Sequence, residues 1–202
     1  MNGHETEVKF FVRDLARVGS RLHELGAGMV QPRAHEINIR FDTRDGALRR
    51  EFKALRLRRD TEAKLTYKGP SKERDGVLKR REIEFTVGNF ESAIQFLEAL
   101  GFEPAAYYEK YRETHELNGA HVMLDELPFG SFVEIEGGDT DTLRSNAAAL
   151  GLRWDAAVRM GYLTLFERVA EKHSLDAGQL SFNAVKPVQI DENDLGITPA
   201  DQ

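Results

Sequence analysis

Polar and hydrophobic side chains alternate along much of the chain, with the period of two that is typical of β-strands. The first alternating stretch places Glu5, Glu7 and Lys9 on one face and apolar or uncharged side chains on the other. Further pairs of glutamates, each pair separated by one isoleucine, occur in residues 80–85 and 132–136. Because the same charged pattern recurs, we expect these strands to share one charged surface.

Alternation predicts eight strands in all, and residues that favour turns separate them. Asn118-Gly119 is a two-residue connection that favours a type I′ hairpin. We expect residues 43–51 to form a polar turn and residues 71–76 a charged loop. The strands are predicted at residues 5–10, 36–43, 53–59, 63–69, 77–87, 105–117, 121–126 and 131–136.

A period near 3.6 replaces the alternation in other segments and predicts helices, each preceded by a side chain that can cap it. The first three helices end on Leu-Gly, a common helix ending. Since each Glu-x-Glu strand is followed by such a helix, the repeat favours pseudo-symmetric halves. The helices are expected at about residues 15–25 after Asp14, about 90–100 after Asn89, in a segment after Asp139 or Asp141 that ends at Leu150, and at about 156–170 after Asp155.

These elements predict an α+β fold, a closed eight-stranded antiparallel β-barrel with helices packed outside. Closure would remove exposed strand edges. Helices need apolar strand faces to pack against, so the charged faces should point inward and line a tunnel. The alternative is an amphipathic sheet whose charged side faces water, which is the commoner arrangement. Helices on the apolar side and mixed charges on almost every strand argue against it.

The predicted tunnel lining carries charges of both signs. A carrier of apolar ligands is disfavoured, because its lining would be apolar. The acidic residues expected inside are Glu5, Glu7, Glu36, Glu82, Glu84, Asp125, Glu134 and Glu136, and the basic ones are Lys9, Arg40, Arg56, Arg58, Lys64, Lys68, Arg80, Lys110 and Arg112.

Composition narrows the classes of function. The chain has 202 residues and a net charge of −6, which argues against a general binder of nucleic acid or of anionic membranes. It has no cysteine, which excludes disulfides and thiolate metal sites and fits a cytoplasmic protein. We expect no secretory signal and no membrane span. The length favours one domain, residues 1–170, followed by an acidic, partly disordered extension, residues 171–202.

A lining of this kind suits one class of ligand. Arginine and lysine side chains bind phosphate oxygens, and arginine can do so through two hydrogen bonds at once. Carboxylates bind Mg²⁺ or Mn²⁺, and the metal can then bridge to phosphate. Both kinds of charge in one cavity therefore indicate a complex of a divalent metal with a polyphosphate.

The motifs, in their order along the chain, resemble those of the CYTH family, the triphosphate tunnel metalloenzymes. Glu5-x-Glu7-x-Lys9 resembles the opening ExExK motif of that family, and the resemblance extends to about residue 170. Arg40 departs from the pattern, because an aromatic residue is common at that position. The other matching motifs are residues 36–43, Leu55-Arg56-Leu57-Arg58, residues 65–70, Arg80-x-Glu82-x-Glu84, Lys110-x-Arg112, residues 124–126 and residues 132–136.

The resemblance implies roles for the charged residues. It implies that Glu82 and Glu84 either orient basic neighbours, which we favour, or act as additional metal ligands. Tyr162 resembles a helix tyrosine near the tunnel, with core packing as the alternative. The implied metal ligands, for Mg²⁺ or Mn²⁺, are Glu5, Glu7, Asp125, Glu134 and Glu136. The implied triphosphate ligands are Lys9, Arg56, Arg58, Lys68, Arg80, Lys110 and Arg112, with Lys9, Arg56 and Arg58 as the catalytic residues.

Three functions remain open at this stage. We favour metal-dependent hydrolysis of a triphosphate, either inorganic tripolyphosphate or an organic triphosphate. The first alternative is a class IV adenylyl cyclase that makes cyclic AMP and pyrophosphate from ATP, and the second is a module that binds polyphosphate or nucleotide without chemistry. The expected partner is a small-molecule triphosphate, with no nucleic acid and no membrane, and a homodimer is an open alternative.

Overall fold

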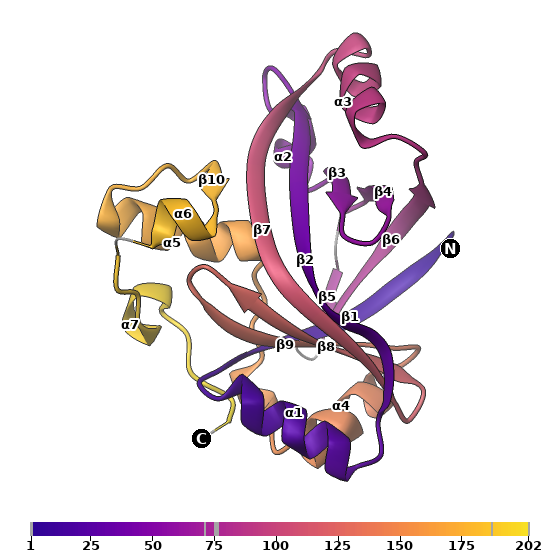
Figure 1. Ribbon diagram of the computed structural model, residues 1–202, viewed down its shortest axis with the longest axis vertical. Helices are drawn as coiled ribbons and strands as arrows, with labels where there is room; N and C mark the ends of the chain where they lie inside the picture. The colour runs from indigo at the N-terminus through magenta and orange to yellow at the C-terminus, as the bar shows by residue number, and fades with distance from the viewer. Residues whose placement is uncertain (1, 71, 75–76, 187, 202) are drawn as a thin grey trace.

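One curled sheet organises the molecule (Figure 1). The computed structural model describes the backbone of residues 2–70, 72–74, 77–186 and 188–201, and the side chains of residues 6–70, 80–186 and 188–201. Eight antiparallel strands follow one another in the order β1-β9-β8-β7-β2-β3-β4-β6. Their bounds are β1 Asn2–Val12, β2 Gly28–Thr43, β3 Ala54–Arg59, β4 Ala63–Lys68, β6 Val77–Thr86, β7 Phe102–Leu117, β8 Ala120–Leu127 and β9 Gly130–Glu136.

Strand β1 divides its length between the two ends of this sheet. Its first half, Asn2 to Glu7, pairs with β6, and its second half, Glu7 to Val12, pairs with β9. The ends therefore meet only over half a strand, and the eight strands do not pair along their full lengths as a complete barrel requires. The α+β class and the antiparallel order are confirmed, but the sheet is a curled half-barrel rather than the closed tube that the sequence predicted.

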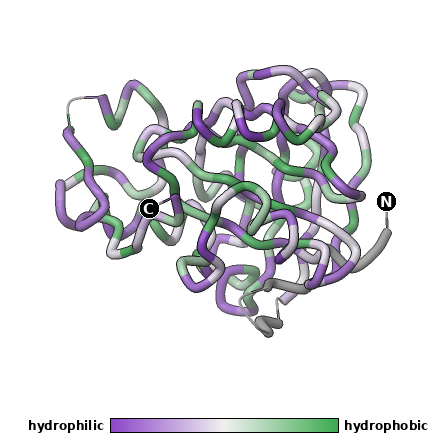
Figure 2. Tube along the Cα trace, turned by 90° about the horizontal axis from the view of Figure 1, so that it is seen from below, coloured by the Kyte–Doolittle hydropathy of each residue, from purple (hydrophilic) through white to green (hydrophobic). Residues whose placement is uncertain are grey.

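Helices cover the convex face of the sheet, as predicted. Helices α1 (Leu15–Glu24) and α4 (Thr140–Ala149) lie side by side below it in Figure 1. Their side chains Leu22 and Leu143 share one hydrophobic core with Phe10 of β1, and all three are fully buried. Helix α3 (Phe90–Ala99) covers the other end in the same way. Figure 2 shows hydrophilic and hydrophobic positions alternating along much of the chain.

The predicted caps of the first three helices are confirmed. Asp14, Asn89 and Asp139 each cap a helix, because each side chain accepts a hydrogen bond from the backbone N–H three residues on, at 2.7 to 2.9 Å. Asp139 rather than Asp141 is therefore the cap of α4. The Asn118-Gly119 turn is also confirmed, since both residues have the positive φ that a type I′ turn requires.

The helix predicted at residues 156–170 is wrong at its start. Residues Trp154–Ala156 form a short 3₁₀-helix, and α5 begins only at Tyr162 and runs to His173. The reason is pairing with the first strand: the Val158 N–H donates to the Lys9 carbonyl at 2.7 Å, which holds this segment extended. As a result, residues of the segment 157–161 lie at the concave face of the sheet.

Three smaller differences follow from neighbouring elements. Strand β2 is much longer than residues 36–43, because β7 pairs with it over its whole length, with irregular register around Pro32, which has no N–H to donate. The predicted turn at 43–51 contains the short helix α2 (Ala47–Arg50). The predicted loop at 71–76 contains strand β5 (Lys72–Arg74), and residues 71, 75 and 76 lie outside the described residues.

The predicted extension, residues 171–202, forms short elements in its described part: β10 (Gln179–Leu180), α6 (Phe182–Val185) and α7 (Glu192–Leu195). Strand β10 pairs in parallel with β7, and the Leu180 and Leu195 side chains are fully buried in a core shared with α5. The sequence predicted weak order here because these elements are too short to show a periodicity. Helix α5 runs through residue 170, and the domain boundary there stays a prediction.

Candidate active site

The concave face of the half-barrel encloses a cavity of about 590 Å³. Alternation along the strands places charged side chains on this face, while the apolar ones face the helices outside. Among the described residues, ten basic and six acidic side chains line the cavity, so its lining is cationic although the whole chain is acidic. The basic residues are Lys9, Arg40, Arg56, Arg58, Lys64, Lys68, Arg80, Lys110, Arg112 and Arg159, and the acidic ones are Glu7, Asp60, Glu82, Glu84, Glu134 and Glu136.

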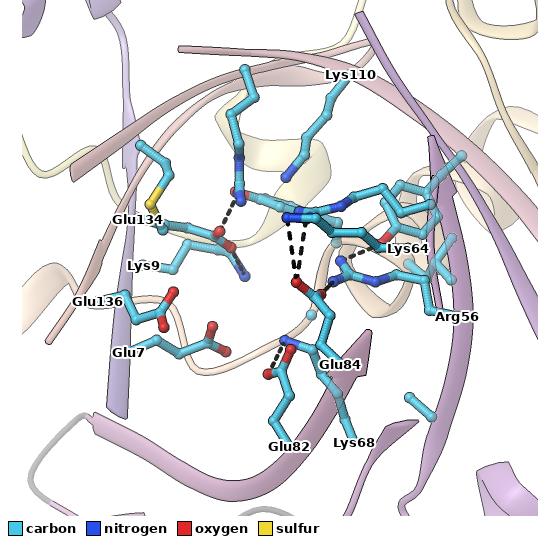
Figure 3. Close-up of a pocket in the computed structure, with 18 of the residues that line it drawn as sticks. Glu7, Lys9, Arg56, Lys64, Lys68, Glu82, Glu84, Lys110, Glu134 and Glu136 are labelled. Carbon is cyan, nitrogen blue, oxygen red and sulfur yellow. Dashed lines mark hydrogen bonds and ion pairs between the residues drawn. The ribbon is translucent and has the colours of Figure 1, made fainter. Parts of the chain in front are cut away.

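A chain of ion pairs crosses one wall of the cavity, formed by β1, β9, β8 and β7 (Figure 3). Lys9 Nζ lies 2.9 Å from Glu134 Oε1, and Arg112 bonds to both Glu134 and Asp125. Lys110 Nζ donates to Asp125 Oδ2 at 3.0 Å. Tyr162, at the start of α5, adds its hydroxyl at 2.7 Å from the same Asp125 oxygen. Every side chain in this series of ion pairs therefore has a partner of opposite charge or a hydrogen bond.

The charges in this wall stabilise one another. Burial alone would lower the pKa of Lys9, but the charges of Glu134 and Glu7 outweigh it and raise that pKa. Burial would raise the pKa of Glu134, but Lys9 and Arg112 outweigh it and hold that pKa well below its usual range. Burial, with the charges of Asp125 and Glu134, raises the pKa of Tyr162, so its hydroxyl keeps its proton.

Glu36 lies beneath the cavity floor and is almost wholly buried. It accepts a hydrogen bond from Asn38 at 2.9 Å and pairs more loosely with Lys110 and Arg58, each at 3.5 Å. Burial would raise its pKa, but Lys110 and Arg112 outweigh this and lower it, so the side chain is a carboxylate. Glu36 therefore supplies a fixed negative charge under the basic residues.

The opposite wall, formed by β3, β4 and β6, is held less tightly. Glu84 lies 3.6 to 3.8 Å from each of Arg56, Arg58 and Lys64, and accepts a hydrogen bond from Thr66 at 2.8 Å. In the described part of the chain, the Nε donors of Arg56 and Arg58 are buried without a hydrogen-bond partner. On this wall Lys68 also pairs with Glu82 at 2.9 Å. Both glutamates thus contact basic neighbours.

Two carboxylates differ from the others in their surroundings. Glu7 and Glu136 are opposite each other in the β1–β9 register, and both point into the cavity side by side (Figure 3). Arg80 donates to Glu7 at 2.9 Å. No group of three histidine or acidic side chains converges as a metal site within the part of the chain that is described, which leaves out the side chain of Glu5. Two adjacent carboxylates repel each other, and a divalent cation between them would remove that repulsion.

Most of the side chains predicted as site residues lie together in this cavity. Those that line it are Lys9, Arg56, Arg58, Lys68, Arg80, Lys110, Arg112, Glu7, Glu134 and Glu136. Asp125 lies behind the lining and is fully buried by its partners. The side chain of Glu5 lies outside the described residues. Tyr162 both lines the cavity and packs against Phe132, so the two interpretations of this residue hold together.

The cavity also contains residues that sequence reasoning missed. Gln31, Thr114, His121 and Met123 form an uncharged patch, in which Gln31 is opposite Thr114 and Thr114 is opposite Met123. Strand alternation could have found Thr114, since it shares a face with Lys110 and Arg112; the same alternation places His121 and Met123 on one face with Asp125, but it gave them no role in the site. No signal pointed to Arg159, because the segment was predicted as helix.

Comparisons with known proteins agree with this arrangement. The family model of the CYTH domain matches residues 3–150. A Vibrio parahaemolyticus structure described as a proposed adenylate cyclase has a TM-score of 0.73 and 21% identity, and the match covers 83% of this chain and 99% of that one. A conserved hypothetical protein from Pyrococcus furiosus has a TM-score of 0.67 and 25% identity, and the match covers 79% of this chain and 98% of that one.

A further similar structure comes from Hippeastrum and is described as a proposed adenylyl cyclase with a dominant triphosphatase activity. Its TM-score is 0.61 at 20% identity, and the match covers 81% of this chain and 95% of that one. At such identities, the Vibrio and Hippeastrum structures show a shared fold only. No curated protein matches the sequence. No helix in the described part of the chain is long and apolar enough to cross a membrane.

Proposed function

Because the chain belongs to the CYTH domain family, we propose that it is a metal-dependent enzyme that hydrolyses a triphosphate inside the charged cavity. The substrate is inorganic tripolyphosphate or an organic triphosphate, and the concave face of the curled sheet holds it. Neighbouring folds described as adenylate cyclase and as triphosphatase support this class of chemistry.

The observation that carries the proposal is the set of uncommitted guanidinium donors. Within the described residues, Arg56 and Arg58 are nearly buried, lie no closer than 3.5 Å to any hydrogen-bond or ion-pair partner, and have Nε atoms without a hydrogen-bond partner. A buried donor without a partner costs free energy, and charge-assisted hydrogen bonds to phosphate oxygens would recover it. A triphosphate offers several such oxygens in a row.

A divalent metal, Mg²⁺ or Mn²⁺, fits the carboxylate side of the cavity. We propose Glu7 and Glu136 as its ligands, together with Glu5. When bound, the metal would neutralise phosphate oxygens and polarise water. The resemblance also implied Asp125 and Glu134 as ligands, but each bonds to two basic side chains here, whereas Glu7 bonds to Arg80. We therefore propose that these two carboxylates position Lys9, Lys110 and Arg112.

In the proposed reaction, water attacks the terminal phosphorus of the triphosphate. The bond from that phosphorus to the bridging oxygen breaks, and the bridging oxygen leaves with the electron pair. The attacking water loses one proton to the solvent, so the products are orthophosphate and a shortened phosphate chain. Lys9, Arg56 and Arg58 would act as catalytic residues by stabilising the negative charge on the phosphate oxygens. Lys68, Arg80, Lys110 and Arg112 would hold the rest of the chain.

The test is phosphate release from tripolyphosphate by wild type and by Glu7→Gln under limiting Mg²⁺. Glu98→Gln is the matched control, because it removes the same charge from an exposed position on α3. We expect Glu7→Gln to lose at least about 100-fold in kcat/KM, as for loss of a metal ligand, and the control to match wild type. Near wild-type turnover by Glu7→Gln would disprove the assignment. Tight calorimetric binding without any phosphate release would favour a binding module instead.

Adenylyl cyclisation is the second candidate, and the uncharged patch favours it. Gln31, Thr114, His121 and Met123 offer hydrogen bonds and an apolar contact beside Glu136, as a base and ribose would need. Incubation with ATP and with tripolyphosphate, with product separation by chromatography, distinguishes the reactions. Cyclic AMP and pyrophosphate as the main products would establish the cyclase, and a higher kcat/KM for orthophosphate release from tripolyphosphate would establish the hydrolase.

A further inference from the structure

Arg40 is a cavity residue to which the family resemblance gives no role. It lies on β2 directly opposite Arg56 of β3, and both side chains line the cavity. Tyr108 of β7 also lines the cavity there, and its hydroxyl accepts a long hydrogen bond from Arg56 at 3.5 Å. Two guanidinium groups and one hydroxyl therefore meet at this place.

Within the described residues, Arg40 forms no ion pair with a carboxylate. The nearest acidic residue on its own strand face is Asp42, but that carboxylate accepts the backbone N–H groups of Thr43, Leu48 and Arg49 at 2.8 to 3.0 Å. The Asp42 carboxylate is therefore occupied by backbone N–H groups before and at the start of α2. Other arginines of the cavity, such as Arg58 and Arg112, each contact at least one carboxylate.

The surroundings of Arg40 are unfavourable in the absence of an anion. Its Nε is buried without a hydrogen-bond partner among the described residues. Like charges directly opposite each other on paired strands destabilise a sheet, and Arg40 faces Arg56 in this way. Burial, together with the charges of Arg56 and Arg80, lowers the pKa of Arg40. An oxyanion between the two guanidinium groups would correct all three features.

We propose that Arg40, with Arg56 and the Tyr108 hydroxyl, forms an anion subsite that binds a terminal phosphoryl group of the substrate. The identity of the ligand rests on the proposed function, whereas the subsite rests on the contacts above. A terminal phosphoryl group occurs at both ends of tripolyphosphate and at one end of a nucleoside triphosphate, so both sources are tested. Neutral groups such as a nucleobase would add no negative charge between the two guanidinium groups.

The test compares wild type, Arg40→Gln, Arg40→Lys and the control Arg44→Gln, which removes a charge from an exposed position four residues along. Calorimetry measures binding of tripolyphosphate and of ATP with EDTA present, so neither turnover nor metal binding contributes. We expect Arg40→Gln to bind tripolyphosphate at least about tenfold more weakly, Arg40→Lys to fall between it and wild type, and Arg44→Gln to match wild type. An equal loss of affinity for ATP means that the subsite binds the terminal phosphoryl group that both ligands have. A loss of affinity for tripolyphosphate alone means that the subsite binds its second terminal phosphoryl group, which a nucleoside triphosphate lacks.

The melting temperature without ligand separates binding from a structural role. We expect Arg40→Gln to melt at or above the wild-type temperature, because the like-charge pair is removed, and to lose most of the stabilisation that orthophosphate gives wild type. Unchanged affinity for both ligands, or a large fall in melting temperature, would overturn the subsite. If wild type hydrolyses no triphosphate yet Arg40→Gln weakens binding, the subsite stands and the proposed function falls. If wild type binds neither tripolyphosphate, ATP nor orthophosphate, both fall.

Discussion

Carboxylates of the same chemical type have different surroundings in this cavity, and their partners decide what each can do. Asp125 is fully buried and bonds to Lys110, Arg112 and Tyr162, so its oxygens are occupied. Glu7 lies at the cavity surface beside another carboxylate. Removal of the charge should therefore destabilise the fold in the first case and weaken cation binding in the second.

The first prediction tests this difference through Asp125→Asn. The substitution leaves Lys110 and Arg112 buried with one carboxylate fewer, and breaking a buried ion pair typically costs about 3–5 kcal/mol. We expect the free energy of unfolding in urea to fall by about that amount, and to fall less in Glu7→Gln, which removes one ion pair, that with Arg80, and relieves the repulsion from Glu136. An Asp125→Asn variant with wild-type stability but weaker Mg²⁺ binding would instead support the metal-ligand role.

The second prediction concerns Arg56→Ala. Arg56 touches Glu84 at 3.7 Å and Tyr108 at 3.5 Å, both weak contacts, so the side chain contributes little to the fold without ligand. Loss of its hydrogen bonds to phosphate should raise KM for tripolyphosphate by about 10- to 100-fold, with little change in melting temperature. Steady-state kinetics beside thermal unfolding measures both. A large drop in melting temperature with unchanged KM would identify Arg56 as a structural residue.

At the scale of elements, the sequence predicted what local patterns determine. Strand alternation correctly placed Lys9, Arg56 and Lys110 on the inner face, because the side-chain period of a strand is strictly two. It could not predict that β1 pairs with two strands, or that Val158 joins the edge of β1, since both depend on contacts between distant segments. Arg159 was missed for the same reason.

The short C-terminal elements show how a few polar contacts replace a long periodic pattern. Asp194 of α7 bonds to Lys172, to His173 at 3.2 Å and to the Asp191 N–H at 3.0 Å, and so ties α7 to α5. The bond from Lys172, with the Asp191 N–H, lowers the pKa of Asp194 from its usual 3.8 to about 2. A lowered pKa in the folded state means that the ionised form stabilises the fold.

The third prediction follows from this sign. The stabilisation from Asp194 is fully present above the unfolded pKa of 3.8 and is lost as pH falls through about 2. We therefore expect Asp194→Asn to melt below wild type by a constant margin above about pH 4, and the margin to shrink as pH falls further. Thermal unfolding of both proteins across pH 7 to 2.5 measures the margin. A margin that is the same at every pH would mean that the ionised carboxylate makes no contribution.

At the scale of the whole molecule, charge is distributed unevenly. The chain carries a net charge of −6, yet basic side chains outnumber acidic ones in the cavity lining. The positive charges in the cavity attract a ligand that carries several negative charges, although the protein as a whole is acidic. The low-dielectric walls of the cavity strengthen this attraction. In the protein without ligand, the basic side chains of the cavity repel one another, and a bound polyanion would reduce this repulsion. Binding of a polyanion should therefore raise the stability of the folded protein.

The last prediction measures this coupling in the whole protein. A ligand that binds only the folded state at 100 times its Kd stabilises it by about 2.7 kcal/mol. For a chain of this size, that energy corresponds to a rise of roughly 5–10 °C in melting temperature. We expect tripolyphosphate to produce this rise in wild type and at most about half of it in Arg56→Ala, while sodium sulfate at equal ionic strength produces much less in either. Addition of Mg²⁺ should raise the wild-type melting temperature further, and this additional rise should be absent in Glu7→Gln. Without metal, tripolyphosphate should raise the melting temperature of Glu7→Gln about as much as that of wild type, because the basic residues hold the anion. Equal shifts from tripolyphosphate and sulfate would show that the cavity recognises charge in general rather than a phosphate chain.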